Sequence, residues 1–239
     1  MTEKAIDSPY VVWDVKGFEE ELEQLLTVSN TKIYRDGEII YLQGQKSKEF
    51  FFVRQGRVKV SILRGDGSEK TLSIQEDNTF FGEYAAFDGQ PHFATAVALE
   101  RSEIARIPVS GTISLIAVNP TIALLIISRI ARKYRSLGFQ VEGMAFLDAQ
   151  RRVARILVSL ANEVGEQEEE GIVIRKGITH EGLASLTGLS RVRVTTVLNN
   201  LDRADLIKKK RGELTIIDLE KLHDLLEEIA VSQVEKIPL

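Results

Sequence analysis

The sequence contains no cysteine. A chain of 239 residues without a thiol excludes disulfide bonds, thiolate zinc sites, cysteine-ligated iron–sulfur clusters and thiol-based redox sensing. It also has no run of about 18 uninterrupted apolar residues, and its first residues, MTEKAIDSPY, lack the charged-then-apolar pattern of a signal peptide. We therefore expect a cytoplasmic protein that does not associate with a membrane.

Histidine is scarce, because only His92, His180 and His223 occur. None of them has a metal-ligand spacing to another or lies in a nucleophile motif, and the sequence has no Gly-rich phosphate loop. Carboxylates are plentiful, but on the predicted helices they mostly follow the polar face, so no catalytic pair can be named. The sequence predicts neither an enzyme nor a metal site.

Charge is distributed unevenly, although the net charge is only −4. The average argues against indiscriminate nucleic-acid binding, but basic residues concentrated in one part of the chain still favour it there. Acidic residues form a block from Glu166 to Glu170. The basic clusters of the last third are Arg151, Arg152 and Arg155, then Arg191 and Arg193, then Lys208 to Arg211. Any single cluster is equally well explained as a solvated face, so its meaning depends on structural context.

Short strand-like runs separated by turn residues extend from Thr31 to Pro108. They read EIIYLQG, FFFVRQG, VKVSILRGDG, KTLSIQ, TAVALE and EIARIP. Runs of this length with Gly and Asp-Gly punctuation predict a compact antiparallel β-roll or jelly-roll barrel. Arg64 to Gly67 is the predicted tip of a hairpin. Six glycines stand where a turn needs a positive φ or close backbone approach: Gly37, Gly44, Gly56, Gly65, Gly67 and Gly82.

A long helix is predicted after Pro120. Its apolar residues alternate spacings of four and three, which is the heptad pattern of a coiled coil and favours a homodimer. The predicted dimer seam consists of Ala123, Ile127, Ile130, Tyr134, Leu137, Val141 and Met144. The next step reaches Asp148, a good N-cap, so a second helix with the sequence AQRRVARILVSLANEV should begin there after a hinge. A helix that packs only on its own domain would show a similar apolar stripe, and this alternative stays open.

The segment ITHEGLASLTGLSRVRVTTVLNNLDRADLI predicts a helix-turn-helix. After a surface loop, GEQEEEG, one helix covers Glu181 to Thr187, Gly188 makes the turn, and Ser190 caps a second helix. The segment LIKKKRGELTIID that follows turns at Arg211-Gly212 and predicts a two-stranded wing. Two packed helices in a metabolic enzyme can imitate the first pattern, but the wing and the upstream helix favour a DNA-binding winged helix.

The second helix of this motif carries the predicted base contacts near its N-terminal end, the part that such helices insert into the major groove. These residues are Arg191, Val192, Thr195, Thr196 and Asn199; arginine suits guanine, threonine a base edge or thymine methyl, and asparagine adenine. Residues predicted to contact phosphate, and so to position without specifying a sequence, are Thr179, His180, Ser190 and Arg193, with Lys209 and Arg211 on the wing.

The sequence resembles the cyclic-AMP receptor and fumarate-nitrate reduction regulator (CRP/FNR) family of bacterial transcription factors over nearly its whole length. The resemblance is carried by DGEIIYLQGQKSKEFFFVRQGRVKV, DGSEKTLSI, FFGEYAAFDGQ, AFLDAQRRVARIL and TGLSRVRVTTVLNNL. It implies an α+β protein with an effector-sensing β-roll of the cyclic-nucleotide-binding type at residues 1–118, a dimerisation helix at 119–147 and a winged helix-turn-helix at 148–239. The implied partners are a second copy of the chain, double-stranded DNA with two-fold related half-sites, and RNA polymerase.

The expected effector site departs from the family pattern. Where nucleotide-binding members have an Arg-Ser pair after Gly82 and Glu83, this chain has His92-Phe93, which lacks the guanidinium for a cyclic phosphate. A Thr-Ser pair that contacts adenine is matched by Leu137-Gly138. Cyclic AMP is therefore not expected, and neither is haem, although His92 could ligate it. The predicted pocket consists of Phe81, Gly82, Glu83, His92, Phe93, Ala94, Tyr134, Leu137 and Gly138, with an apolar lining suited to an organic acid or aromatic effector.

Two alternatives to an effector-gated regulator remain at this point. One is a DNA-binding regulator that needs no effector. The other is a ligand-binding regulatory module that does not recognise DNA. The second predicts an intact phosphate arginine and no recognition helix, and the sequence shows the reverse. Whether the protein activates or represses cannot be inferred from these residues.

Overall fold

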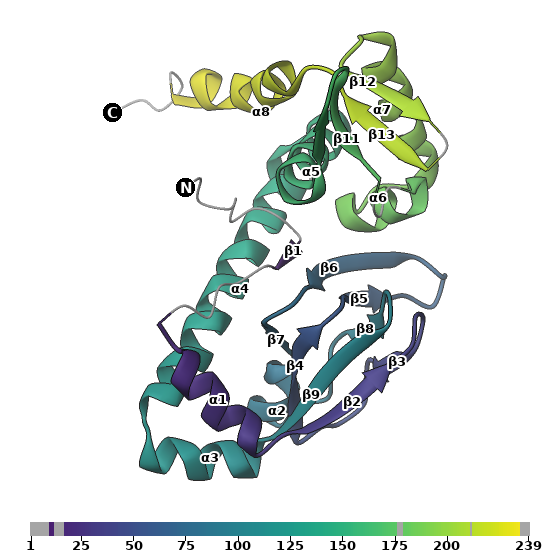
Figure 1. Cartoon of the computed structure of the whole chain (residues 1–239). Helices are drawn as coiled ribbons and strands as arrows, with labels where there is room; N and C mark the ends of the chain where they lie inside the picture. Colours follow the sequence, from purple (N-terminus) through teal and green to yellow (C-terminus); the bar gives the residue numbers. More distant parts are fainter. Residues whose placement is uncertain (1–9, 12–16, 176–178, 211, 235–239) are drawn as a thin grey trace. The chain divides into compact units, whose positions relative to one another are not determined.

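The computed structural model describes residues 10–11, 17–175, 179–210 and 212–234 and divides the chain into two compact units. One unit extends to Leu137 and the other begins at Gly138, so the division falls inside the long helix α4 (Thr121–Phe146) (Figure 1). No helix in the described parts of the chain is both long and apolar enough to cross a membrane.

The first unit is the predicted antiparallel roll, built from two sheets (Figure 1). One sheet has the order β1-β6-β5-β8-β3 and the other β2-β9-β4-β7, and β1 is the exception in pairing parallel with its neighbour β6. The strands are β1 (Tyr10–Val11), β2 (Asn30–Tyr34), β3 (Ile39–Tyr41), β4 (Glu49–Gln55), β5 (Val58–Leu63), β6 (Glu69–Gln75), β7 (Thr79–Phe81), β8 (Thr95–Ala98) and β9 (Ser102–Pro108). The helices of this unit are α1 (Glu19–Thr27), α2 (Glu83–Asp88), α3 (Val109–Val118) and the first part of α4.

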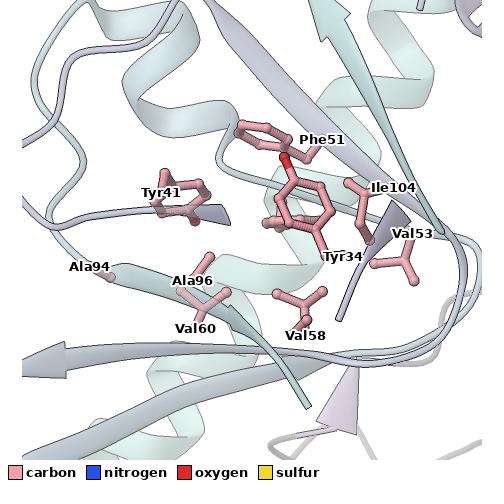
Figure 2. Packing of buried hydrophobic residues seen from close by; sticks show 11 residues of the cluster. Tyr34, Tyr41, Phe51, Val53, Val58, Val60, Ala94, Ala96 and Ile104 are labelled. Atoms are coloured by element: carbon pink, nitrogen blue, oxygen red, sulfur yellow. The ribbon is translucent and has the colours of Figure 1, made fainter. Parts of the chain in front are cut away.

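The sheet containing β4 is buried on both faces. Side chains alternate along a strand, so Phe51 and Val53 enter the core between the two sheets (Figure 2). Phe50 and Phe52 enter a second core on the other face, with Leu25 of α1 and Leu125 of α4. This double burial explains why the run FFFV is apolar throughout instead of alternating with polar residues.

Two of the turns confirm the glycine pattern, and one glycine departs from it. Between β5 and β6, the Gly67 N–H donates to the Arg64 carbonyl at 3.0 Å, so the predicted hairpin tip is confirmed. Gly56 has φ +108°, and a Cβ there would lie 2.3 Å from Ser102 Oγ. The prediction for Gly65 is wrong, because its φ is not positive and no atom lies within 4 Å of its Cβ position. A tip that already turns at Gly67 does not need a second special residue.

The second unit contains the end of α4 and a winged helix. Its other elements are α5 (Ala149–Val164), β10 (Glu166–Glu168), β11 (Gly171–Ile174), α6 (His180–Thr187), α7 (Arg191–Arg203), β12 (Ile207–Lys210), β13 (Glu213–Ile216) and α8 (Leu219–Val234), with sheet order β10-β11-β13-β12. Asp148 caps α5 as predicted, accepting from the Arg151 N–H at 2.9 Å. The loop predicted for GEQEEEG is wrong: it is a hairpin, because β11 pairs with β13 of the wing and β10 pairs with β11.

The predicted dimer seam lies along α4. Ile127, Tyr134, Val141 and Met144 are exposed, and Ala123, Ile130 and Leu137 are half-buried. The buried residues that α4 contributes to the core around α1 are Ile122, Leu125 and Ile126, and the half-buried seam residue Ile130 also packs against that core. The helix therefore carries an apolar stripe covered by its own chain and an exposed one, and Ile130 belongs to both.

The close approach at Gly56 gives a stability prediction. Gly56→Ala should destabilise the roll by about 2 to 4 kcal/mol, because the added Cβ collides with the Ser102 side chain and backbone and the left-handed φ adds strain. The measurement is urea unfolding of the full chain, followed by hydrogen exchange in β4 and β9.

The matched control is Gly67→Ala, which has φ +83° but no atom within 4 Å of the added methyl. It should lose only about 1 to 2 kcal/mol, the cost of the left-handed backbone alone. Equal losses at the two sites would contradict a steric role for Gly56.

Candidate functional sites

The helix-turn-helix is held by capping at both helix starts. Thr179 Oγ1 accepts from the Gly182 N–H at 2.8 Å at the start of α6, and Ser190 Oγ accepts from the Arg193 N–H at 3.2 Å at the start of α7. Gly188 between them is left-handed, with φ +70°, and its N–H closes α6 on the Ala184 carbonyl. Both hydroxyls are thus used to satisfy helix N-termini, in positions that Thr and Ser favour.

Packing leaves one side of α7 free. The apolar residues that α6 and α7 bury are Leu183, Ala184, Leu186, Val194, Val197, Leu198 and Leu201. Arg191, Val192, Arg193 and Thr196 are exposed, and Val192 is exposed to 77%. The structure thus brings most of the predicted base contacts to a solvent-facing surface at the N-terminal part of α7.

The two threonines of this face have already used their hydroxyl protons. Thr195 Oγ1 donates to the Arg191 carbonyl at 2.9 Å, and Thr196 Oγ1 donates to the Val192 carbonyl at 3.1 Å. A threonine hydroxyl has one proton but two lone pairs. What these side chains still present to a ligand is therefore an acceptor oxygen and a methyl group. Thr195 Oγ1 also lies 2.8 Å from His180 Nδ1, which links the two helices.

Asn199 and Lys209, which sequence reasoning assigned to different roles, contact each other. Lys209 Nζ of the wing donates to Asn199 Oδ1 at 2.5 Å and lies 3.5 Å from Asp202 Oδ2. Asn199 keeps its NH₂ group and the second lone pair of its Oδ1. A bidentate contact between Asn199 and adenine would therefore share Oδ1 with Lys209.

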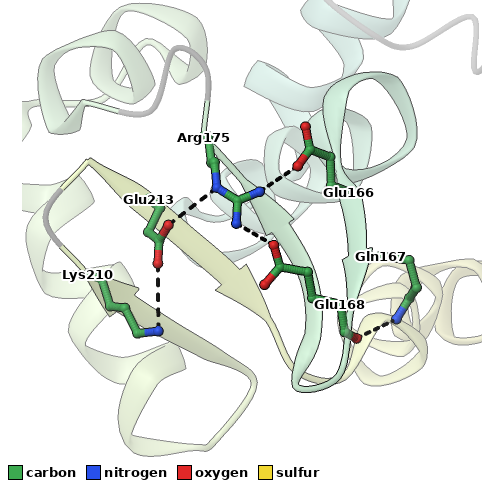
Figure 3. A network of polar contacts seen from close by, with 6 residues as sticks. All are labelled: Glu166, Gln167, Glu168, Arg175, Lys210 and Glu213. Carbon is green, nitrogen blue, oxygen red and sulfur yellow. Dashed lines mark hydrogen bonds and ion pairs between the residues drawn. The ribbon is translucent and has the colours of Figure 1, made fainter.

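The wing lysines are paired with carboxylates from neighbouring elements. Lys208 Nζ lies 3.3 Å from Glu170 Oε2, and Lys210 Nζ lies 3.7 Å from Glu213 Oε1. Figure 3 shows the network beside them, in which Arg175 meets Glu166, Glu168 and Glu213. These groups are solvent-accessible, so the pairs are weak and can exchange for phosphate. Arg211, also predicted to contact phosphate, lies outside the described residues.

The predicted effector residues of the roll are only partly brought together. Phe81, Gly82, Glu83, His92 and Ala94 are buried. Phe93 and Tyr134 are exposed, to 47% and 79%, and Leu137 is half-buried. Within the single chain, Phe93 and Tyr134 therefore do not line an apolar interior as predicted. Phe93 packs against Tyr84, with 5.5 Å between the ring centroids. Tyr134 belongs to the uncovered stripe of α4. Gly138 belongs to the other unit.

A buried ion pair occupies this region, and sequence reasoning missed one of its members. Lys133 Nζ of α4 lies 2.6 Å from Glu83 Oε1 and donates to the Phe80 carbonyl at 2.5 Å. Glu83 is 2% exposed, and its Oε2 has no partner among the described residues. The signal for Lys133 was available, because it follows Ile122, Ile126 and Arg129 at helical spacing on the side of α4 that faces the roll.

His92 is buried against an aromatic ring. Its imidazole stacks on Tyr41, with 3.7 Å between the ring centroids and 8° between the planes. Burial lowers the pKa of His92, which favours the neutral ring, and burial also raises the pKa of Tyr41, with a contribution from the Glu83 charge. His92 Nε2 has no partner among the described residues. The position that matches the family's phosphate arginine thus holds a stacked imidazole whose charged form is disfavoured by burial.

Comparison with known proteins points to one family. A sequence profile described as cyclic nucleotide-binding domain matches residues 31–119, and one described as Crp-like helix-turn-helix domain matches residues 151–225. The cyclic AMP receptor protein of Thermus thermophilus is 28% identical over 88% of this chain and 93% of its own length. The cAMP-activated global transcriptional regulator CRP of Salmonella typhimurium is 30% identical over 78% of this chain and 89% of its own.

Solved structures agree with this assignment. A CRP/FNR-family transcriptional regulator from Thermus thermophilus superposes with a TM-score of 0.68 at 26% identity, covering 83% of this chain and 99% of that one. The regulator CLP of Xanthomonas campestris, described as c-di-GMP responsive, has a TM-score of 0.76 at 21% identity over 83% of this chain and 99% of that one. The second likeness concerns the fold alone.

The buried ion pair should contribute strongly to the stability of the roll. Lys133→Met should destabilise the roll by about 3 to 5 kcal/mol, because it leaves the Glu83 carboxylate buried without a counter-charge. Adding Glu83→Gln to the Lys133→Met variant should recover most of the loss. Unfolding of the two single variants and the double variant measures the coupling.

Lys32→Met is the control, because the pair that Lys32 makes with Glu38 lies on the surface. It should change stability little. The ion pair does not hold α2 against α4 if Lys133→Met loses as little stability as this control, or if adding Glu83→Gln restores none of the lost stability.

Proposed function

Because the chain belongs to the CRP/FNR family of transcription regulators, we propose that it acts as a homodimer that binds a two-fold symmetric DNA site and is gated by a small molecule other than cyclic AMP. As a transcription factor it would act in the cytoplasm, where its DNA is, and it would act by binding and not by catalysis. The relative from Salmonella typhimurium is named as a global transcriptional regulator.

The observation that carries the DNA-binding part is the exposed N-terminal face of α7. A recognition helix needs long or apolar side chains that no partner within the chain covers, and Arg191, Val192 and Thr196 meet this condition. Arg191 suits bidentate contact with guanine. Val192 and the threonine methyls suit thymine methyls, since the hydroxyl protons are already used.

The homodimer is supported by the uncovered stripe of α4. A second copy is the natural occupant, because the seam follows a heptad repeat, which pairs with itself. Ile127, Tyr134 and Val141 would leave water on pairing, at about 25 cal/mol per Å² of apolar area. A two-fold axis along α4 would present two copies of α7 to half-sites about one helical turn apart.

The effector is proposed to differ from cyclic AMP because of two residues. His92 supplies no guanidinium for a phosphate, and burial lowers its pKa, which disfavours the charged ring. The Glu83 carboxylate is already bound to Lys133 of α4. An anionic nucleotide would meet a site in which the buried Lys133 ammonium is already neutralised by Glu83. The names of several relatives mention cyclic AMP, but that ligand belongs to those proteins.

The Glu83–Lys133 pair also suggests how an effector would act. A ligand that contacts Glu83 would compete with Lys133 and so change how α4 is held against the roll. Gating requires only that the ligand prefer one arrangement of α4, by a coupling free energy of about 1 to 3 kcal/mol. If the ion pair alone fixes the arrangement of α4, the protein is the alternative regulator that needs no effector.

Selection of bound sequences from random duplex DNA by the purified full-length protein, followed by sequencing, tests the function. We expect an enriched site with two-fold symmetry and half-sites about one turn of DNA apart. The selection is run without effector, with cyclic AMP, and with extracts of small metabolites. Enrichment only in the metabolite arm supports gating by another molecule.

The other outcomes decide against particular parts of the proposal. Enrichment that depends on cyclic AMP would overturn the effector proposal, and equal enrichment in every arm would favour an effector-independent regulator. An asymmetric single half-site would overturn the homodimer. No enrichment in any arm would favour a ligand-binding module without DNA recognition.

Substitutions on α7 and the wing should have different effects. Arg191→Ala should cost about 1 to 3 kcal/mol of specific affinity and relax one base position, because it removes a base contact. Lys210→Ala should weaken binding to all sequences alike and make it less dependent on salt, because it removes an exposed wing ammonium proposed to contact phosphate. Titrations of selected and scrambled duplexes at several salt concentrations measure both effects, and the same behaviour in the two variants would refute this division.

A further inference from the structure

The three consecutive lysines of β12 face in two directions. Side chains alternate along a strand, and each residue shares its face with the residue opposite it on the neighbouring strand. Lys209 lies opposite Leu214 of β13 and on the same face as Ile207, and both of these are buried. The side chains of Lys208 and Lys210 point the other way and are 53% and 66% exposed, whereas that of Lys209 is 26% exposed. Lys209 is thus the wing lysine on the face of β12 that meets α7.

Two residues of the recognition helix hold the ammonium of Lys209. Its Nζ donates to Asn199 Oδ1 at 2.5 Å and lies 3.5 Å from Asp202 Oδ2. Asn199 and Asp202 are three residues apart on α7, so they lie on the same side of the helix. The other two wing lysines instead meet carboxylates of the β10–β11 hairpin and of β13. Lys209 therefore connects the wing to the recognition helix.

We propose that Lys209 is a positioning residue for base recognition: it fixes the side-chain amide of Asn199 so that the oxygen faces the wing and the NH₂ group is presented to DNA. Lys209 then acts on sequence specificity through Asn199, and not through the phosphate contact that the sequence predicted. This inference rests on the proposed DNA-binding function.

The chemistry of lysine determines which end of the amide it contacts. An ammonium group only donates hydrogen bonds, whereas an asparagine amide has an acceptor oxygen at one end and a donor NH₂ group at the other. Turning the amide over would place the NH₂ group against Lys209 Nζ, donor against donor. The contact at 2.5 Å therefore holds Asn199 Oδ1 toward the wing and directs Nδ2 away from it.

Asn199 belongs to the face of α7 that is proposed to meet the bases. It follows Val192, Thr195 and Thr196 by seven, four and three residues, which places all four on one side of the helix. In the major groove, the atoms that accept from an NH₂ group are the purine N7 atoms, guanine O6 and thymine O4. A fixed donor favours guanine, which offers two of these acceptors side by side, over adenine, whose bidentate contact also needs Oδ1.

Asp202 helps to keep Lys209 in this position when DNA approaches. An ammonium group near the duplex is attracted to phosphate. The carboxylate of Asp202 balances the charge of Lys209, and the hydrogen bond to Asn199 adds a second contact on the same helix. Moving Lys209 to a phosphate would break both contacts, whereas Lys210 would leave only the longer pair with Glu213.

The decisive variant is Lys209→Met, which retains an apolar stem of similar length but cannot donate. Lys210→Met is the matched control, because Lys210 is the next residue of the same strand and pairs with Glu213 instead of α7. Asn199→Ala removes the amide itself. Selection from random duplex DNA is repeated with each variant, and the duplex selected by the wild type is titrated at several salt concentrations.

We expect Lys209→Met and Asn199→Ala to lose the preference at the same base position of each half-site, a guanine in the wild-type site. Both should bind the selected duplex several-fold more weakly. Lys209→Met should keep the salt dependence of the wild type, whereas Lys210→Met should lower the salt dependence and keep every base preference. The double variant of Lys209→Met and Asn199→Ala should lose no more affinity than Asn199→Ala alone, because the lysine acts through the asparagine.

Lys209→Arg is the conservative variant. A guanidinium group also donates without accepting, so this variant should keep the base preference that Lys209→Met loses. The proposal is wrong if Lys209→Met lowers the salt dependence as Lys210→Met does and leaves the base preferences intact, since Lys209 is then a phosphate contact. It is also wrong if Lys209→Met and Asn199→Ala alter different base positions.

A measurement without DNA separates this inference from the proposed function. In nitrogen-15 NMR of the free full-length protein, the side-chain NH₂ signal of Asn199 is the one that disappears in Asn199→Ala. This signal should shift in Lys209→Met and stay in place in Lys210→Met. An unchanged signal in Lys209→Met would overturn the inference whether or not the protein binds DNA. If the signal shifts but the wild type selects no duplex, the proposed function fails and the role of Lys209 in base recognition fails with it.

Discussion

The sheet that contains β4 holds the first unit together, because it is buried on both faces. One face forms the interior of the roll with the second sheet, and the other packs against α1 and the start of α4. Neither core can be formed without the other, since Phe50, Phe51 and Phe52 alternate between them. The Glu83–Lys133 pair lies where this shared structure meets α4, and both of its charged groups are buried there.

Much of the fold could be predicted from the sequence, where local signals and tertiary packing agree. The cap at Asp148, the turn at Gly188 and the hairpin at Arg64 to Gly67 each depend on one residue with a strong preference, and each appears in the structure. The GEQEEEG segment failed because its strand character is not local. Glutamate and glutamine have little β propensity, and the hairpin exists because Ile172 to Ile174 pair with β13.

The candidate sites were predictable in outline but not in their contacts. The exposed face of α7 follows from helical periodicity alone. The pairing of Lys209 with Asn199, and of Thr195 with His180, joins residues 10 and 15 positions apart through tertiary structure, which periodicity does not encode. In the roll, the resemblance identified Glu83 and His92. It did not reveal Lys133, because the counter-charge comes from a helix 50 residues away.

The uncovered stripe on α4 has a thermal consequence. Any association that covers Ile127, Tyr134 and Val141 removes apolar surface from water, which lowers the heat capacity. Hydrophobic association of this kind weakens on cooling. Ion pairs such as those of the wing do not depend on the hydrophobic effect. An assembly formed through α4 would therefore loosen first in the cold, while each winged helix keeps its own fold and its own charged surface.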